Sequence, residues 1–418
     1  MTIRTIVAYL FGSRAAIREI AACRNAVWLG FLFVLSAGFA REYDGEDLLH
    51  EPWHLGIPLV ASLGTSFLLY CLLPTRGNAE LAPEFSFWRG YRSFLSLYWM
   101  TAPLAWLYAI PVERLLSAGE ATRANLWLLG IVAAWRVILM IRVVSVLFNV
   151  KFRHALFPVM LFADTVALVL LFLTPLPVVS IMGGIRLTES EQLIQATVFR
   201  VGFTGVLTWP VWLIGMVAVR SSATGPWIPG FGASYDRRIA LSAWGLAVCA
   251  LVVWIPILPV TQTEQQLRWR VESDLRAGRI DSALDTMSSH SRSDFPAHWE
   301  PPPRVGYGEK KPSLVSVLTV VYFREPDWVR AAYFEKLNQH EGGWAWLWLS
   351  ADDEDVDRLL DFLERLPSDS PVLRSIRGTL KSEFEHDFRT PTANRKERIR
   401  RLLERLPREK KRTRPTLE

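Results

Sequence analysis

The feature that most constrains this chain is a series of seven long apolar stretches within its first 260 residues. A helix needs about 20 apolar residues to cross the hydrocarbon core of a bilayer, and about 17–25 is the usual range. Stretches of this length and composition predict membrane-spanning helices. We expect spans at residues 25–40, 56–73, 94–112, 125–149, 156–182, 201–219 and 239–260.

The distribution of charge divides the chain into two parts. Residues 1–260 carry 19 Lys and Arg with 14 Asp and Glu, whereas the shorter remainder carries 28 with 27. We therefore expect an all-α fold, in which a polytopic membrane helix bundle of six to seven spans precedes a small helical soluble domain. The predicted parts are an amphipathic N-terminal segment at 1–24, a transmembrane bundle at 25–260, a helical soluble domain at 261–390, and a basic amphipathic helix with a disordered tail at 391–418.

The first apolar stretch has two interpretations. It ends in small residues, Gly38 and Ala40, which would also suit cleavage of a secretory signal. The segment before it is long for a signal and places Ile6, Leu10 and Ile17 among arginines, a pattern typical of an amphipathic helix on a membrane surface. We favour an uncleaved first span, and the cleaved signal stays open.

Basic residues flank the apolar stretches unequally. The N-terminus and the segments after the second, fourth and sixth stretches hold 12 Lys and Arg, whereas the alternate segments hold 4. Cytoplasmic loops of membrane proteins carry the excess of positive charge. The pattern predicts a plasma or inner membrane protein with a cytoplasmic N-terminus, and seven spans would place its C-terminal domain outside. If one stretch is re-entrant, this domain changes sides.

Three charged residues, Arg136, Arg142 and Asp164, fall inside the predicted spans. A charge at this depth is costly and needs a partner or a function. Arg142 and Asp164 lie at similar distances from the short turn between the fourth and fifth stretches, so we predict an ion pair between them. We interpret this pair first as a packing contact, with a proton or ion pathway as the alternative. Arg136 has no equally obvious partner and is the candidate for a substrate-facing group.

Prolines such as Pro103, Pro175 and Pro210 fall within or beside the spans. A proline removes a helical hydrogen bond and kinks or breaks a helix. Broken helices form the binding sites of many transporters, where corresponding interruptions in two repeated halves are the stronger indication. No internal repeat is visible in this sequence. We therefore favour ordinary kinks.

The segment 41–54 is acidic and contains two histidines. Its residues His50-Glu51-Pro52-Trp53-His54 resemble the HExxH motif of zinc metalloproteases, in which both histidines bind zinc from one helical face and the glutamate is the general base. Pro52 does not suit that geometry, because a helix that begins at the proline would leave His50 outside.

The same segment offers a noncatalytic cation site as a further alternative. Its candidate ligands are Asp44, Glu46, Asp47, His50 and His54, which combine hard oxygen donors with imidazoles. The interpretation that we favour is a solvated loop, whose carboxylates cap the next helix and help to keep the segment outside the membrane. No cofactor is expected.

Helix signals run through the C-terminal part, and we expect helices at 263–277, 280–290, 312–323, 326–340, 353–366, 371–388 and 394–406. The turn around Gly278 resembles the turn between the paired helices of tetratricopeptide-like arrays, but no repeat period follows it. We infer a small domain of helix hairpins. Its last helix places Ile399, Leu402 and Leu406 on one face among arginines, which suits docking onto the domain itself, onto anionic lipid or onto a partner helix.

Three functional classes are open. We favour a noncatalytic membrane anchor or scaffold that presents a helical interaction domain, and therefore lean against an enzyme. The alternative is a transporter or channel that uses Arg136 and the Arg142–Asp164 pair. The second alternative is a membrane metalloenzyme that uses His50, Glu51 and His54. Expected partners are the lipid bilayer and a protein partner of the C-terminal domain. Nucleic acid is not expected, and the oligomeric state stays open.

Overall fold

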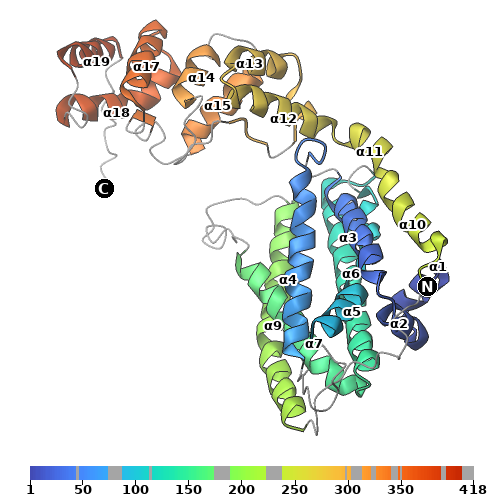
Figure 1. Ribbon diagram of the computed structural model, residues 1–418. Coiled ribbons are helices and arrows are strands. Elements are labelled where there is room, and N and C mark those ends of the chain that lie inside the picture. The colour runs from blue at the N-terminus through green and yellow to red at the C-terminus, as the bar shows by residue number, and fades with distance from the viewer. Residues whose placement is uncertain are drawn as a thin grey trace. The chain divides into compact units, whose positions relative to one another are not determined.

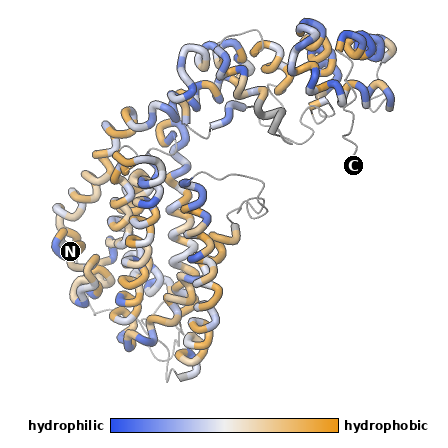
Figure 2. Tube along the Cα trace, turned by 180° about the vertical axis from the view of Figure 1, so that it is seen from behind, coloured by the Kyte–Doolittle hydropathy of each residue, from blue (hydrophilic) through white to orange (hydrophobic). Residues whose placement is uncertain are grey.

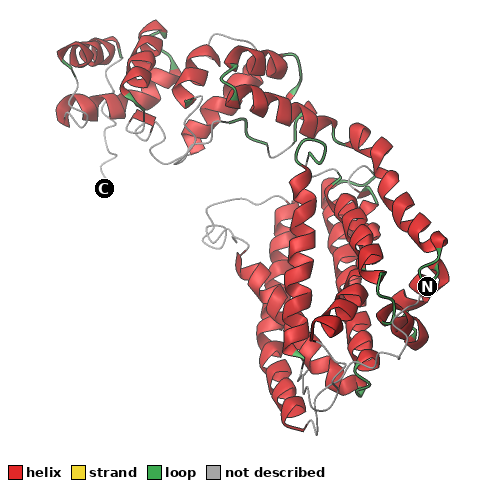
Figure 3. Cartoon of the chain, viewed as in Figure 1, coloured by secondary structure: helices red, strands yellow, loops and turns green. Residues whose placement is uncertain are grey.

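The computed structural model describes residues 1–43, 47–73, 87–112, 115–173, 189–222, 238–296, 299–302, 313–321, 326–339, 347–348, 351–386 and 392–406. Within these ranges the chain consists of helices and loops and contains no strand (Figure 3). The prediction of an all-helical chain is confirmed for this part of the sequence.

The chain forms two compact units, Met1–Gln262 and Thr263–Glu418, which we call unit 1 and unit 2. Hydrophobic residues dominate most helices of unit 1, whereas hydrophilic and hydrophobic residues alternate along those of unit 2 (Figure 2). Unit 1 contains α1 (Ile3–Leu10), α2 (Arg14–Ala21), α3 (Ala26–Glu42), η1 (Pro52–Leu55), α4 (Gly56–Leu72), α5 (Phe87–Trp99), η2 (Ala102–Ala109), α6 (Ala118–Leu147), α7 (Phe152–Leu173), α9 (Glu189–Ser222), α10 (Leu241–Val252) and α11 (Trp254–Thr261), where η denotes a 3-10 helix (Figure 1).

Five described helical segments are long and apolar enough to cross a membrane. They are Pro52–Leu72, Gly119–Leu147, Phe152–Phe172, Glu189–Ser221 and Leu241–Thr261. These segments overlap the second, fourth, fifth, sixth and seventh predicted spans. The first predicted span corresponds to α3, whose 17 residues lie at the short end of the range that crosses a bilayer.

The third predicted span, 94–112, is not one continuous helix. α5 ends at Trp99, and η2 begins at Ala102 with Pro103 in its first turn. Because Pro103 has no backbone N–H, it cannot donate the hydrogen bond to the Trp99 carbonyl that would continue α5. Our preference for an ordinary kink at Pro103 was therefore wrong, and the chain breaks at Met100 and Thr101. Pro210, by contrast, lies inside the continuous helix α9.

The N-terminal segment packs into unit 1 as two short helices. Ile6 and Tyr9 on α1 are fully buried. The Tyr9 hydroxyl donates a hydrogen bond to the Leu97 carbonyl of α5 at 2.5 Å. Trp135 Nε1 of α6 donates to the Leu10 carbonyl at 2.8 Å. The apolar face that we assigned to a membrane surface is therefore covered by neighbouring helices.

Unit 2 contains helices close to the ranges predicted for them. They are α12 (Thr263–Arg276), α13 (Ile280–Ser288), α14 (Leu314–Val321), α15 (Asp327–Gln339), α17 (Asp353–Arg365), α18 (Pro371–His386) and α19 (Ala393–Arg405), with the short η4 (Arg292–Asp294). Leu275, Leu284, Leu318 and Leu360 belong to one buried core that these helices share.

The predicted turn between α12 and α13 is present in unit 2. Gly278 has a φ of 75°, a conformation that glycine adopts without strain. Asp274 holds the turn together, since its carboxylate accepts hydrogen bonds from Arg279 Nη2 and Ser282 Oγ, each at 2.6 Å. The hydrogen bond from Ser282, followed by that from Arg279, lowers the pKa of Asp274 below its usual value.

Candidate functional site

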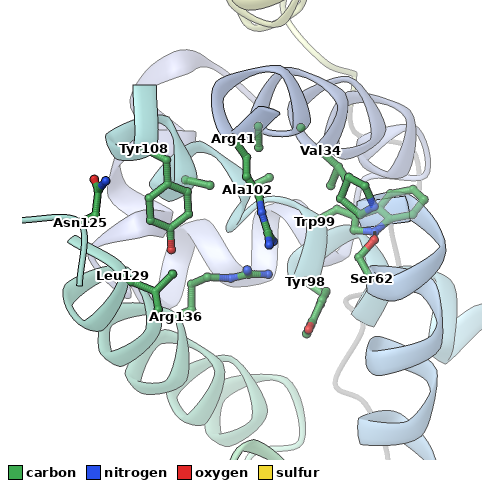
Figure 4. Close-up of a pocket in the computed structure, with 14 residues that line it drawn as sticks. Val34, Arg41, Ser62, Tyr98, Trp99, Ala102, Tyr108, Asn125, Leu129 and Arg136 are labelled. Carbon is green, nitrogen blue, oxygen red and sulfur yellow. Dashed lines mark hydrogen bonds between the residues drawn. The ribbon is translucent and has the colours of Figure 1, made fainter. Parts of the chain in front are cut away.

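A cavity of about 340 Å³ lies within unit 1 and contains Arg136 in its wall. Its lining residues come from α3, α4, α5, η2 and α6, so the break between α5 and η2 forms part of it. The polar members of the lining are Arg41, Ser62, Tyr98, Tyr108, Asn125 and Arg136. We call this space the arginine cavity (Figure 4).

Arg136 is held between an alcohol and an aromatic ring. Its Nε donates a hydrogen bond to Thr101 Oγ1 at 3.2 Å, and its guanidinium carbon lies 5.6 Å from the centre of the Tyr98 ring. Thr101 is a residue of the break, and it is buried. Both partners are neutral, and no carboxylate of the described residues lies within ion-pair distance of Arg136.

Arg41 supplies a second guanidinium from the last turn of α3. Its Nε lies 3.2 Å from Glu42 Oε1, so one edge of the group faces the adjacent carboxylate. Figure 4 shows the guanidinium groups of Arg41 and Arg136 pointing into the same space, with the Tyr108 hydroxyl directed into it from η2. Two cations from helices that are far apart in the sequence therefore share one cavity.

Neutral hydrogen bonds fix the wall that α4 and α5 contribute. Trp99 Nε1 donates to Ser62 Oγ at 2.9 Å, and the Ser62 hydroxyl donates to the Leu59 carbonyl at 2.8 Å. The hydroxyls of Tyr98 and Thr65 share a hydrogen bond at 3.1 Å. These contacts position the wall without adding a negative charge to it.

The chemistry of this lining favours an anion. The side chains that line the cavity include two arginines, two phenols, a serine and an asparagine, and no Asp or Glu is among them. Arginine presents a rigid fork of N–H donors that matches the geometry of a carboxylate or a phosphate. Charge-assisted hydrogen bonds of this kind are stronger than neutral ones. A small oxyanion would therefore find both charge and donors in the cavity.

The predicted ion pair between Arg142 and Asp164 does not form. Arg142 Nε donates to the Gly12 carbonyl at 3.2 Å, so this side chain faces the connection between α1 and α2. Asp164 Oδ2 accepts a hydrogen bond from the Thr208 hydroxyl at 2.6 Å, so the carboxylate faces α9. Spacing along α6 and α7 gave the depth of each group but not the direction in which it points.

The histidine segment does not form the helix that an HExxH site requires. The helix begins with η1 at Pro52, so His50 precedes it, as expected from the proline. His50 Nδ1 lies 2.7 Å from Asp47 Oδ2, whereas His54 Nε2 lies 3.7 Å from Glu51 Oε2. The two imidazoles thus contact different carboxylates.

Asp47 is the structural centre of this segment. It is fully buried, and its Oδ1 accepts hydrogen bonds from the backbone N–H groups of Leu49 and His50 at 3.2 Å each. Two of the predicted cation ligands, Asp44 and Glu46, lie outside the described residues. In the part of the chain that is described, no group of three or more potential ligands could hold a metal ion.

The basic face of α19 docks onto unit 2 itself. Arg395 Nε and Nη2 donate to the two oxygens of Asp357 at 2.8 and 2.7 Å, and Nη1 donates to Asp353 at 2.8 Å. Arg398 pairs with Asp361 and Glu364 one turn further along. This is one of the three docking modes that the sequence allowed. The tail after residue 406 lies outside the described residues.

Several lining residues were not singled out from the sequence. We grouped Arg41 with the acidic segment that follows it, and we assigned no role to Tyr98 or Tyr108. The sequence signal that could have identified the two tyrosines is Pro103. It lies between Tyr98 and Tyr108 and marks the break between α5 and η2, and both tyrosines line the cavity with Arg136.

The chain matches no family model, and no curated protein or solved structure is similar to it. Its function is therefore inferred from the geometry of the molecule alone.

Proposed function

We propose that this protein is an integral membrane protein that binds an anionic ligand in the arginine cavity. The observation that carries the proposal is that Arg41 and Arg136 point into one cavity whose lining contains no carboxylate. Among the functional classes open from the sequence, this geometry favours a transporter or a binding protein over a purely structural anchor. The Arg142–Asp164 pair has no part in it, because the two side chains face different helices.

The energetic reason lies in the charge of Arg136, which is partly buried and whose contacts among the described residues are neutral. A charge that is partly removed from bulk water interacts more strongly with an opposite charge, because the surroundings screen it less. The Arg41 side chain is 69% exposed and pairs with Glu42, and it offers its remaining N–H groups to the cavity. A bound anion would give Arg136 a charged partner and would contact Arg41 as well. The volume of about 340 Å³ lies near the lower end of the range of small-molecule sites.

The ligand would reach the cavity from the side of the membrane opposite the N-terminus. Arg41 lies in the last turn of α3 and Asn125 lies near the start of α6, so both belong to the end of the bundle that the distribution of basic residues predicts to be external. Arg136 lies 11 residues after Asn125 on the same helix, which is about 16 Å deeper at a rise of 1.5 Å per residue. The cavity would therefore extend from the interface toward the middle of the membrane.

Ligand protection tests this proposal on the purified full-length protein. We expect phosphate or acetate, added at constant ionic strength against chloride, to raise the melting temperature in a saturable manner. A ligand at about 100 times its dissociation constant stabilises the folded state by about 2.7 kcal/mol. Arg136→Gln and, separately, Arg41→Gln should lose most of this protection.

The matched control is Arg220→Gln, which removes an exposed arginine from the last turn of α9, outside the cavity. This variant should keep the protection of the unaltered protein. Protection that is equal in all four proteins would show that the anions act elsewhere and would exclude the cavity as the binding site.

A further inference from the structure

The rim of the arginine cavity is apolar and exposed. Leu129 of α6 lines the cavity, yet 57% of it is exposed. On α4, the lining residue Pro58 is also partly exposed. In a protein that spans a membrane, exposed apolar side chains of this kind contact lipid chains.

Two exposed tryptophans mark the level of this rim. Trp127 lies on α6 between the lining residues Asn125 and Leu129, and Trp53 lies in η1, just before α4. Tryptophan concentrates at the level of the lipid headgroups, where its ring is partly in contact with hydrocarbon and its N–H with polar groups. The outer end of the cavity would therefore lie at headgroup depth, on a surface that faces lipid.

We propose that the ligand is an anionic phospholipid taken from the surrounding bilayer. Its phosphate would bind between Arg41 and Arg136, while its acyl chains would stay outside, against Pro58 and Leu129. This inference rests on the proposed function of the arginine cavity and names the source of the anion. The combination of a cationic interior with an apolar rim suits an amphiphile better than a fully water-soluble anion, which has nothing to place on the rim.

The charge of the lining also selects among lipids. A zwitterionic headgroup would bring its own ammonium toward two guanidinium groups, and no lining carboxylate is present to receive that ammonium. A headgroup with a net negative charge avoids this repulsion. We therefore expect a preference for phosphatidylglycerol over phosphatidylcholine.

Native mass spectrometry of the full-length protein in detergent tests this preference. Phosphatidylglycerol and phosphatidylcholine with identical chains would be titrated separately, and the retained lipid counted. We expect phosphatidylglycerol to bind about tenfold more tightly, which corresponds to one strong charge-assisted contact. The Arg41→Gln, Arg136→Gln double variant should lose this preference, and the Arg220→Gln control should keep it. Equal retention of the two lipids by the unaltered protein would overturn the inference.

A rim variant separates a bilayer lipid from a free phosphate. Leu129→Gln alters an exposed apolar residue of the lining and leaves the arginines in place. For a lipid ligand, this change should weaken phosphatidylglycerol binding severalfold and leave protection by inorganic phosphate unchanged. If phosphate protects the protein but neither the lipid preference nor the Leu129 effect appears, the cavity binds a soluble anion and only the lipid is excluded. If phosphate and acetate also fail to protect the protein, both the lipid inference and the proposed function are excluded.

Discussion

Replacing Gly215 by valine is expected to destabilise unit 1 by about 1–3 kcal/mol or more, which is the usual cost of overpacking a close contact. Gly215 of α9 faces the Phe157 ring of α7, and a Cβ built on Gly215 would overlap that ring, lying only 2.7 Å from Phe157 Cγ. A similar approach occurs further along the pair, where a Cβ on Gly205 would lie 3.3 Å from Leu168 Cγ. Small residues let two helices approach closely in this manner.

The melting temperature of the purified protein measures this effect, and Gly130→Val is its matched control. Nothing lies within 4 Å of a Cβ built on Gly130 of α6, so that variant tests the change in residue type without the overlap. The double variant Gly215→Val, Phe157→Ala should recover part of the lost stability, because removal of the ring makes room for the new side chain. Equal melting temperatures for the Gly215 and Gly130 single variants would contradict the packing of α7 against α9.

Removal of the Arg395 side chain is expected to release α19 from unit 2. This side chain is only 16% exposed, and it donates hydrogen bonds to Asp353 and to both oxygens of Asp357. Hydrogen bonds to charged groups contribute about 1.5–3 kcal/mol, and solvent screening reduces this at a partly exposed site. We therefore expect Arg395→Ala to cost about 1–3 kcal/mol. Hydrogen exchange of α19 in the full-length protein should become about tenfold faster or more.

Arg401→Ala provides the comparison for this variant. Arg401 is largely exposed and pairs with Glu397 of its own helix, an arrangement that contributes about 0.3–0.5 kcal/mol. Its exchange rates should stay close to those of the unaltered protein. If both variants have the same effect, the contact between α19 and α17 does not depend on Arg395.

The same contact predicts the response of α19 to acid. The hydrogen bond from Arg395 is the main reason that the pKa of Asp357 lies below its usual value. A carboxylate whose pKa is lowered by folding contributes stability above its unfolded pKa of about 4, and this stability is lost as the pH falls through the lower folded value. Protection of α19 should therefore decrease below about pH 4, and this decrease should be smaller in Arg395→Ala.

Local signals were sufficient to predict the helices of unit 2. Asp352 accepts a hydrogen bond from the Asp355 backbone N–H at 2.8 Å and caps α17. Pro371 begins α18, where a proline costs nothing, and Gly278 has the positive φ of a turn. Each of these effects acts within one helical turn, so a single sequence contains the information.

The arginine cavity depends on contacts that a single sequence does not specify. Arg136 was identified because a charge inside an apolar stretch is costly, and its depth followed from helical spacing. Its neighbours did not follow, because Thr101 and Arg41 approach it only through the packing of α3, η2 and α6. The Arg142–Asp164 prediction failed for the same reason, since equal depth on two helices does not fix the rotation of either helix.

The central claim is that Arg41 and Arg136 bind an anion from outside the chain. An experimental structure of the protein in a bilayer disc that contains phosphatidylglycerol tests this most directly. We predict density for a phosphate group in the arginine cavity, with its oxygens about 2.7–3.2 Å from both guanidinium groups. A structure without such density, in which a carboxylate of the chain itself pairs with Arg136, would contradict the claim.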